Sequence, residues 1–234
     1  MTPRTEPLLW IQLLGLAVLP LEALLILLVL GGSDPGPLPV VEEVLCWSLG
    51  ALAPALLLWR TPADVWSLLL AQIPARGRRE LQQRLSRLQD TLPLRVLGPG
   101  LGALVLLPLL IRLDQQAAIT APLWHPGHLP RLMALLLAAL VMSLMVWQWQ
   151  QLMQSLWLLG RSEGAIASAQ PLGPGELSET RLSLGLPLLL PAPLVFAEPS
   201  PPPVRSAVSG PPLPVEPEQA TADEQGDELD EPIT

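Results

Sequence analysis

Residues 75–87 read ARGRRELQQRLSR, and this arginine-rich stretch decides how the whole chain is organised. It lies between two pairs of long apolar segments, and Arg60 and Arg95 flank it. Short loops rich in Lys or Arg stay on the cytoplasmic side of a membrane. The sequence therefore predicts an integral membrane protein with an arginine-rich cytoplasmic loop over residues 60–91. The arginines that we expect to set orientation and contact lipid are Arg76, Arg78, Arg79, Arg84 and Arg87.

The composition is that of a membrane protein with a polar tail. Half of the 234 residues are apolar and 15% are charged, against about 25% in soluble domains. Residues 161–234 contain three arginines and twelve acidic residues, so the acidic balance of the chain comes from its tail. Because binding to a phosphate backbone depends on basic side chains, we expect no nucleic-acid binding.

Four apolar segments are long enough to be spanning helices, since about 20 residues at about 1.5 Å each cross a hydrocarbon core of about 30 Å. They cover residues 8–30, 39–59, 92–113 and 129–152. Four spans place both termini on the side of the arginines. We therefore predict an all-α protein with a four-helix transmembrane domain over residues 1–160 and a low-complexity, mostly disordered cytoplasmic tail over residues 161–234. The apolar run 182–196 is broken by three prolines, and we favour it as part of the tail over a fifth span.

The loop between the second and third spans is expected to contain two short helices. The apolar run 65–73 follows the helix-start signal Thr61-Pro62-Ala63-Asp64 and is too short to span. We expect it to be a re-entrant or interface-lying helix with Trp66 at headgroup depth. Residues 79–89 place leucines on one face with arginines beside them, which predicts an interfacial amphipathic helix. That helix could lie on anionic lipid or pack beneath the bundle.

Glu22 is the most informative single residue, because a carboxylate inside a membrane is costly and usually faces a partner, a cavity or a proton path. A proton relay needs more members, and no other ionisable residue lies deep in a span. We therefore favour a satisfied interhelical hydrogen bond or a protonated carboxyl group at this position.

His125 and His128 are the second candidate site. They lie in the stretch Trp-His-Pro-Gly-His at residues 124–128, on the non-cytoplasmic side in our topology. Two imidazoles are half of a typical metal ligand set, and no Cys or acid completes the set locally. We favour a polar turn over a metal, pigment or haem ligand.

Small residues recur at helix-contact spacing in three of the spans. The pairs are Ala51 with Ala55, Gly98 with Gly102, and Ala134 with Ala138. Such spacing favours close helix packing, either within the chain or with a partner. The sequence pattern of a nucleophile elbow occurs at Gly160-Arg161-Ser162-Glu163-Gly164. We do not expect a catalytic serine there, because a helix precedes the pattern and no histidine lies on the same side of the membrane. We predict no catalytic residue and no metal site.

The chain resembles the cyanobacterial low-complexity tail membrane proteins over about residues 5–190. Five short motifs carry the likeness: Glu6-Pro7-Leu8-Leu9-Trp10-Ile11 with Leu14-Gly15-Leu16-Ala17, Pro39-Val40, Ala134-Leu135-Leu136-Leu137-Ala138-Ala139-Leu140, Arg161-Ser162-Glu163, and Leu184-Gly185-Leu186-Pro187. The histidine expected near the first tryptophan is replaced by Gln12. The resemblance implies several spans followed by a biased tail in a cyanobacterial thylakoid or plasma membrane. It implies no activity, cofactor or catalytic residue.

The leading functional hypothesis from the sequence is a non-enzymatic scaffold or assembly accessory of a membrane complex, in contact with lipid. The small-residue faces and the tail are the expected surfaces for protein partners. A small transporter or channel subunit is the rival, supported by Glu22 and by the proline-broken third span. A pigment- or haem-binding protein that uses His125 or His128 is the third possibility.

Overall fold

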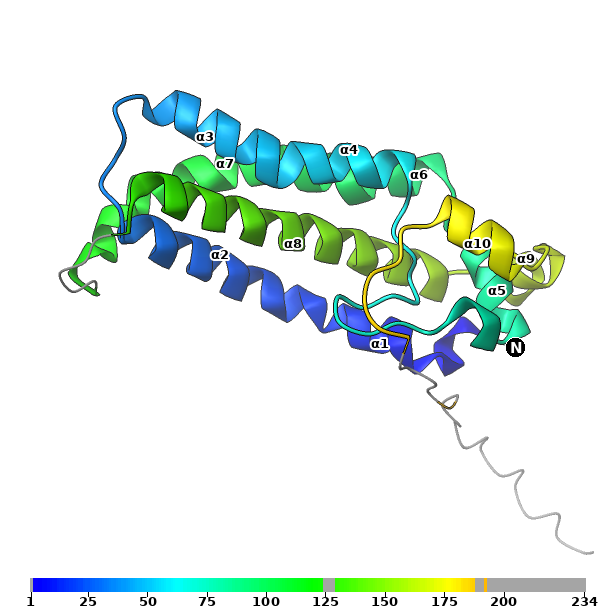
Figure 1. Cartoon of the computed structure of the whole chain (residues 1–234). Coiled ribbons are helices and arrows are strands. Elements are labelled where there is room, and N and C mark those ends of the chain that lie inside the picture. The colour runs from blue at the N-terminus through cyan, green and yellow to red at the C-terminus, as the bar shows by residue number, and fades with distance from the viewer. Residues whose placement is uncertain (1, 124–128, 188–191, 193–234) are drawn as a thin grey trace, which may run out of the picture. The chain divides into compact units, whose positions relative to one another are not determined.

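The structure of the chain is a computed structural model, which describes residues 2–123, 129–187 and 192. Four stretches of helix are long and apolar enough to cross a membrane. They are Pro7–Gly31, Pro39–Arg60, Leu92–Ile119 and Arg131–Leu159. Consecutive spans run in opposite directions (Figure 1). The predicted all-α membrane fold with four spans is therefore confirmed, and the described residues contain no β-strand beyond isolated bridges.

Three of the spans are built from shorter pieces, and the fourth is one helix. The first consists of α1 (Pro7–Leu13) and α2 (Gly15–Gly31). The second consists of α3 (Pro39–Trp47), a π-helical turn (Ser48–Leu52) and α4 (Ala53–Arg60). The third consists of α6 (Leu92–Arg95), a π-helical turn (Val96–Gly100) and α7 (Leu101–Gln116), and the fourth is α8 (Arg131–Leu159). The remaining α-helices are α5 (Glu80–Arg87), α9 (Glu163–Ser168) and α10 (Pro174–Thr180).

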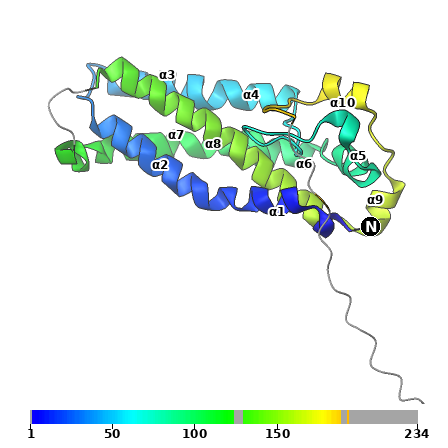
Figure 2. The ribbon, with the colours of Figure 1, turned by 60° about the horizontal axis from the view of Figure 1, so that its bottom comes forward.

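Two ends of the bundle can be distinguished, and we call them the arginine end and the far end. The arginine end carries α1, residues 60–91 and residues 161–187, whereas the far end carries residues 31–38 and 117–123 (Figures 1 and 2). Helical order thus continues past residue 160, where we placed the end of the membrane domain, because α9 and α10 follow it.

Helix α8 is the centre of the bundle, because it contacts pieces of all three other spans. Its small residues allow the closest approach. A Cβ atom added to Gly50 would lie 2.6 Å from both Cα and the carbonyl oxygen of Ala139, so the second and fourth spans touch backbone to backbone there. Pro54 has no N–H to donate to the Gly50 carbonyl four residues before it. Ser143 Oγ lies 3.0 Å from that carbonyl and 3.0 Å from the carbonyl of Ala139, so its hydroxyl group donates across this contact or within α8.

The small-residue faces are used for packing inside the chain. All six residues of the three predicted pairs are buried: Ala51, Ala55, Gly98, Gly102, Ala134 and Ala138. The sequence left open whether such faces meet a partner or another part of the same chain. The fold places them in the interior of the bundle.

At the far end, one arginine joins three of the spans. The Arg131 guanidinium at the start of α8 donates to Glu42 of α3 at 2.9 Å. Its two terminal nitrogens also donate to the two carboxylate oxygens of Asp114 in α7, both at 3.0 Å. The three side chains are between 13% and 18% exposed. This bidentate geometry is the strong form of an ion pair.

Replacing Arg131 by Met should lower the free energy of unfolding by about 2 kcal/mol, between the values for exposed and fully buried ion pairs. The reason is that Glu42 and Asp114 are left without their shared cation. Equilibrium unfolding in mixed detergent micelles, followed by circular dichroism, measures the effect. Arg112→Met is the control, since Arg112 is exposed near the same end of α7. Equal loss in both variants would contradict this account.

Candidate functional site

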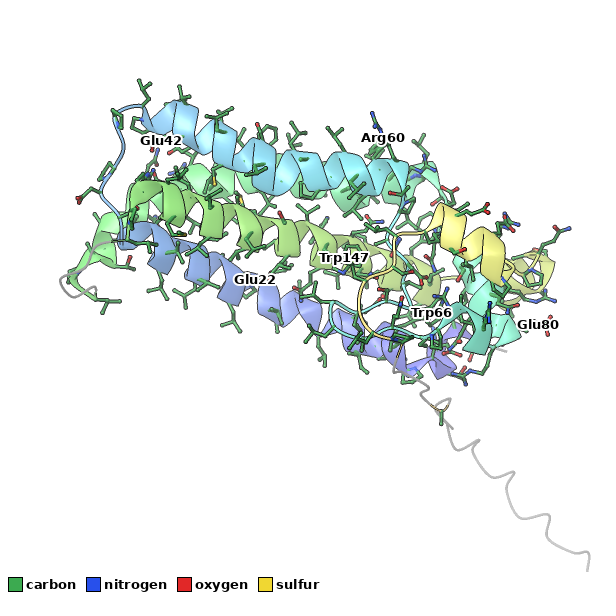
Figure 3. All side chains as sticks on the ribbon, in the orientation of Figure 1. Glu22, Glu42, Arg60, Trp66, Glu80 and Trp147 are labelled. Carbon is green, nitrogen blue, oxygen red and sulfur yellow. The ribbon has the colours of Figure 1, made fainter. Side chains whose placement is uncertain are left out.

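The arginine end is closed by a folded unit that we call the cap, made of residues 61–91 and 161–187. A second apolar core lies beneath it and joins α1, α5, α8 and α9. This core contains Leu8, Leu9, Val65, Trp66, Ile73, Leu81, Leu85, Leu158 and Ile166. Trp66 is fully buried in it and Figure 3 labels its position at this end of the bundle. The Trp66 side chain therefore packs against protein and not against lipid headgroups, and its depth in the membrane stays a prediction.

The predicted helix over residues 65–73 is wrong, because this segment is extended and turns back on itself. Its backbone pairs with a second extended stretch from beyond α10. Asp64 N donates to the Leu182 carbonyl at 2.9 Å, and Leu182 N donates to the Pro62 carbonyl at 3.0 Å. Further along, Leu186 N donates to the Leu70 carbonyl at 3.0 Å. Residues 182–187 of the apolar run therefore line the loop, and residues 188–191 and 193–196 lie outside the described part.

An ion pair inside the cap is nearly inaccessible to solvent. Arg78 Nη2 donates to Asp64 Oδ2, and Arg78 Nη1 donates to Asp64 Oδ1 at 3.2 Å. The side chains of Arg78 and Asp64 are 2% and 1% exposed. Asp64 Oδ1 also accepts a bond from the backbone N–H of Trp66 at 3.4 Å. The pair thus fixes the loop at the point where it turns beneath the bundle.

Glutamines from α8 hold the same loop by its carbonyl groups. Gln151 Nε2 donates to the carbonyls of Asp64 and Ser67, both at 3.0 Å. Gln154 Nε2 donates to the carbonyl of Ala63 at 2.8 Å. The side chains of Gln151 and Gln154 are 4% and 0% exposed. Their spacing carries a signal, since Trp147, Gln151, Gln154 and Leu158 recur every three or four residues on one face.

The five arginines of the loop have different surroundings. Arg78 is buried, so it is not available for the lipid contact that we expected. Arg79 pairs with Glu6 at 3.1 Å, Arg84 with Glu80 at 2.7 Å and Arg87 with Glu176 at 2.8 Å. Arg76 is exposed. Helix α5 packs beneath the bundle through buried Leu81 and Leu85, which decides between the two placements left open by the sequence.

Arg181 is a second buried cation of the cap, and sequence reasoning missed it. Its Nη2 donates to the carbonyl of Ser86 at 3.0 Å, which ties the end of α10 to α5. Burial lowers the pKa of the Arg181 guanidinium, and the nearby carboxylates of Asp90 and Asp64 oppose that effect. Its Nε and Nη1 atoms have no hydrogen-bond partner among the described residues.

Glu22 lies on α2, partway along the bundle, as Figure 3 shows. Its Oε2 atom is buried and has no hydrogen-bond partner in the described part of the chain. The satisfied interhelical hydrogen bond that we favoured is therefore not formed by this oxygen. Glu22 instead lines a pocket of about 380 Å³ with residues of α1, α8 and the cap loop.

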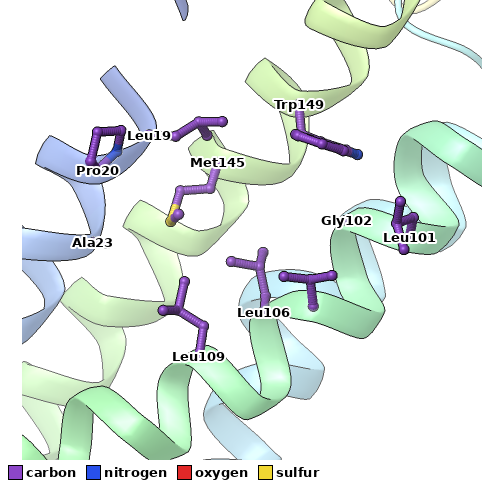
Figure 4. A pocket seen from close by; sticks show the side chains of 10 residues that line it. Leu19, Pro20, Ala23, Leu101, Gly102, Leu106, Leu109, Met145 and Trp149 are labelled. Carbon is purple, nitrogen blue, oxygen red and sulfur yellow. The ribbon is translucent and has the colours of Figure 1, made fainter. Parts of the chain in front are cut away.

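A separate pocket between α2, α7 and α8 is lined by apolar residues and by Gly102 (Figure 4). Its volume is about 320 Å³. Trp149 forms one wall, and a Cβ atom on Gly102 would lie 2.9 Å from Cδ1 of its indole ring. Glycine at this position therefore lets the indole ring lie against α7.

Two sequence-predicted sites remain to be placed. His125 and His128 lie outside the described residues. Within residues 2–123, 129–187 and 192, no group of three or more His, Cys, Asp or Glu side chains could hold a metal ion.

Ser162 of the elbow-like stretch caps α9, where its Oγ accepts a hydrogen bond from Ala165 N at 3.3 Å.

The comparison with known families agrees with this architecture. The model of the family described as low-complexity tail membrane protein-like matches residues 5–193. No curated protein and no solved structure matches the chain. With its four candidate spans and most of its length matched, the chain belongs to the low-complexity tail membrane protein-like family.

Proposed function

We propose that the chain is a non-enzymatic scaffold or assembly accessory of a larger membrane complex. The observation that supports this most is the cap. Buried side chains of α8 and the side chain of Arg181 bind backbone carbonyls of the loop, and Leu8 and Leu9 of the first span pack in the same core. The first and fourth spans, the loop and residues 161–187 therefore form one connected unit. Such a unit offers a folded surface to a partner at one end of the spans.

The proposed partner surface is the acidic, proline-rich sequence that follows the cap, together with the exposed arginines of the cap itself. Residues 197–234 contain three Pro-x-x-Pro stretches, counting Pro199 to Pro202. Such stretches fit partner grooves lined with aromatic residues. The small-residue faces contribute less to this proposal than the sequence indicated, since they are buried within the chain.

We further propose that the arginine end is cytoplasmic, in a thylakoid or plasma membrane. The support is the excess of arginine over residues 60–91. A single cysteine introduced at Ser33 in a Cys46→Ala background should react with an impermeant maleimide added to right-side-out plasma-membrane vesicles. A cysteine at Arg76 in the same background should react only after permeabilisation. The reverse pattern would overturn the proposed orientation.

A small transporter or channel subunit is the second candidate, because Glu22 lines a pocket and its Oε2 atom has no hydrogen-bond partner among the described residues. A pigment- or haem-binding role for His125 or His128 stays a hypothesis, which an absorption spectrum of the purified protein tests.

Two truncations separate the tail from the cap. A chain that ends after Pro187 keeps every cap contact described above, so it should fold normally but lose copurifying partners in a mild-detergent pull-down from native membranes. A chain that ends after Gly160 removes Arg181 and the stretch that pairs with the loop, so it should also become sensitive to trypsin at Arg78. Partner capture that is equal for the full chain and the first truncation would place the contact outside the tail. Recovery of the full chain without any defined partner would remove the support for scaffolding.

A further inference from the structure

Two residues that line the pocket beside Glu22 each carry a buried acceptor oxygen that lacks a donor among the described residues. One is Oε2 of Glu22 and the other is Oε1 of Gln151, and both residues line the pocket. Neither oxygen has a hydrogen-bond partner among the described residues. An unpaired polar atom in an apolar setting costs free energy comparable to a lost hydrogen bond. The pocket is therefore incomplete without a donor.

The amide orientation of Gln151 is fixed by its other bonds. Its Nε2 atom donates to two carbonyl oxygens, those of Asp64 and Ser67, both at 3.0 Å. Carbonyl oxygens only accept, so a flipped amide would place oxygen against oxygen twice. Oε1 is thus the atom left without a donor, and Gln151 is only 4% exposed.

The pocket opens on the outer flank of the bundle, within the depth of the first span. Three apolar side chains of its lining, Ile11, Leu14 and Leu69, are 48%, 69% and 46% exposed. On the inner side, Leu144, Gln148 and Gln151 follow one face of α8 over about 10 Å of helix rise. A molecule that enters this pocket comes from the lipid phase, and its body must be elongated and apolar.

We propose that this pocket binds an elongated apolar molecule with a hydrogen-bond-donating head group, and that Glu22 accepts the bond from that head. A carboxyl group offers an acceptor oxygen whether it is ionised or neutral, so alcohol and amine heads both fit. An ether of the same shape does not fit, because it has no donor. The proposal is independent of scaffolding, since it concerns the flank of the first span and not the tail.

The test is photolabelling of the full chain in liposomes. The probes are hexadecanol with a diazirine near the hydroxyl group, the corresponding amine, and the methyl ether of the alcohol. Cleavage after arginine yields peptide 61–76, which contains Leu68 and Leu69 of this pocket, and peptide 96–112, which contains lining residues of the apolar pocket between α2, α7 and α8. Mass spectrometry of the two peptides therefore measures the labelling of each pocket separately.

We expect the alcohol or the amine to label peptide 61–76 about fivefold more than the ether does, which is the effect of about one hydrogen bond. Glu22→Met should reduce this labelling to the level of the ether, whereas Glu22→Gln, which keeps an acceptor oxygen, should retain it. Labelling of peptide 96–112 should not change. Equal labelling by all three probes, or an effect of Glu22→Met that both peptides share, would overturn the proposal.

Discussion

Replacing Asp64 by Asn should open the cap, at a cost of about 3–5 kcal/mol. Asn keeps the shape of the side chain but removes the negative charge, so the Arg78 guanidinium stays buried without its counter-ion. We expect trypsin to cleave after Arg181, a site that is buried in the folded cap, at least about a hundredfold faster in this variant. The rate is read by mass spectrometry of the released fragment under native conditions.

Two further variants control this experiment. Asp90→Asn breaks the Asp90–Arg95 pair, whose side chains are 50% and 33% exposed, and should change the rate by less than about fivefold. Asp64→Asn combined with Arg78→Met removes both buried charges and should recover most of the protection. If Asp64→Asn behaved like Asp90→Asn, the ion pair would not stabilise the cap.

Replacing Gly50 by Ala should weaken the bundle itself by about 3 kcal/mol or more, an effect typical of forced overpacking. The added methyl group would lie 2.6 Å from backbone atoms of Ala139, which cannot move without separating the second and fourth spans. The free energy of unfolding in mixed detergent micelles, followed by loss of helicity, measures this effect.

The matched control is Gly164→Ala in α9, where a Cβ atom would meet nothing within 4 Å. That change should be neutral or stabilise by up to about 1 kcal/mol, because alanine favours a helix over glycine. The double variant Gly50→Ala with Ala139→Gly is more demanding. It should not restore stability, since the contact is with the backbone of residue 139, and full recovery would show that side chains decide the spacing instead.

The four spans could be predicted because membrane helices leave a direct trace in the sequence: their length and apolar composition follow from bilayer thickness. The structure confirms the four predicted spans. The burial of α5 against the bundle was one of two placements that the amphipathic pattern allowed, since leucines on one face of a helix pack equally well on protein and on lipid.

The interior of the cap could not be predicted, because its partners are backbone groups and residues far along the chain. Gln151 and Gln154 bind carbonyls of residues 63–67, and carbonyls leave no trace in a sequence. The same limit applies to Arg78, which is one of five similar arginines in the sequence and the one whose side chain turns inward. The sequence identified Glu22 as costly but could not show the pocket beside it, because α8 contributes much of that lining.

The pairing of the loop with residues 182–186 has a consequence for biosynthesis. Ser67 accepts a hydrogen bond from Leu184 N, and 117 positions separate the two residues. At about 5–20 residues per second, a ribosome needs about 6–23 s to supply Leu184 after Ser67. During that interval the backbone groups of the loop that pair with residues 182–186 lack these partners. The cap is therefore the last part of the described chain to mature, and it completes only when the two remaining spans have been synthesised.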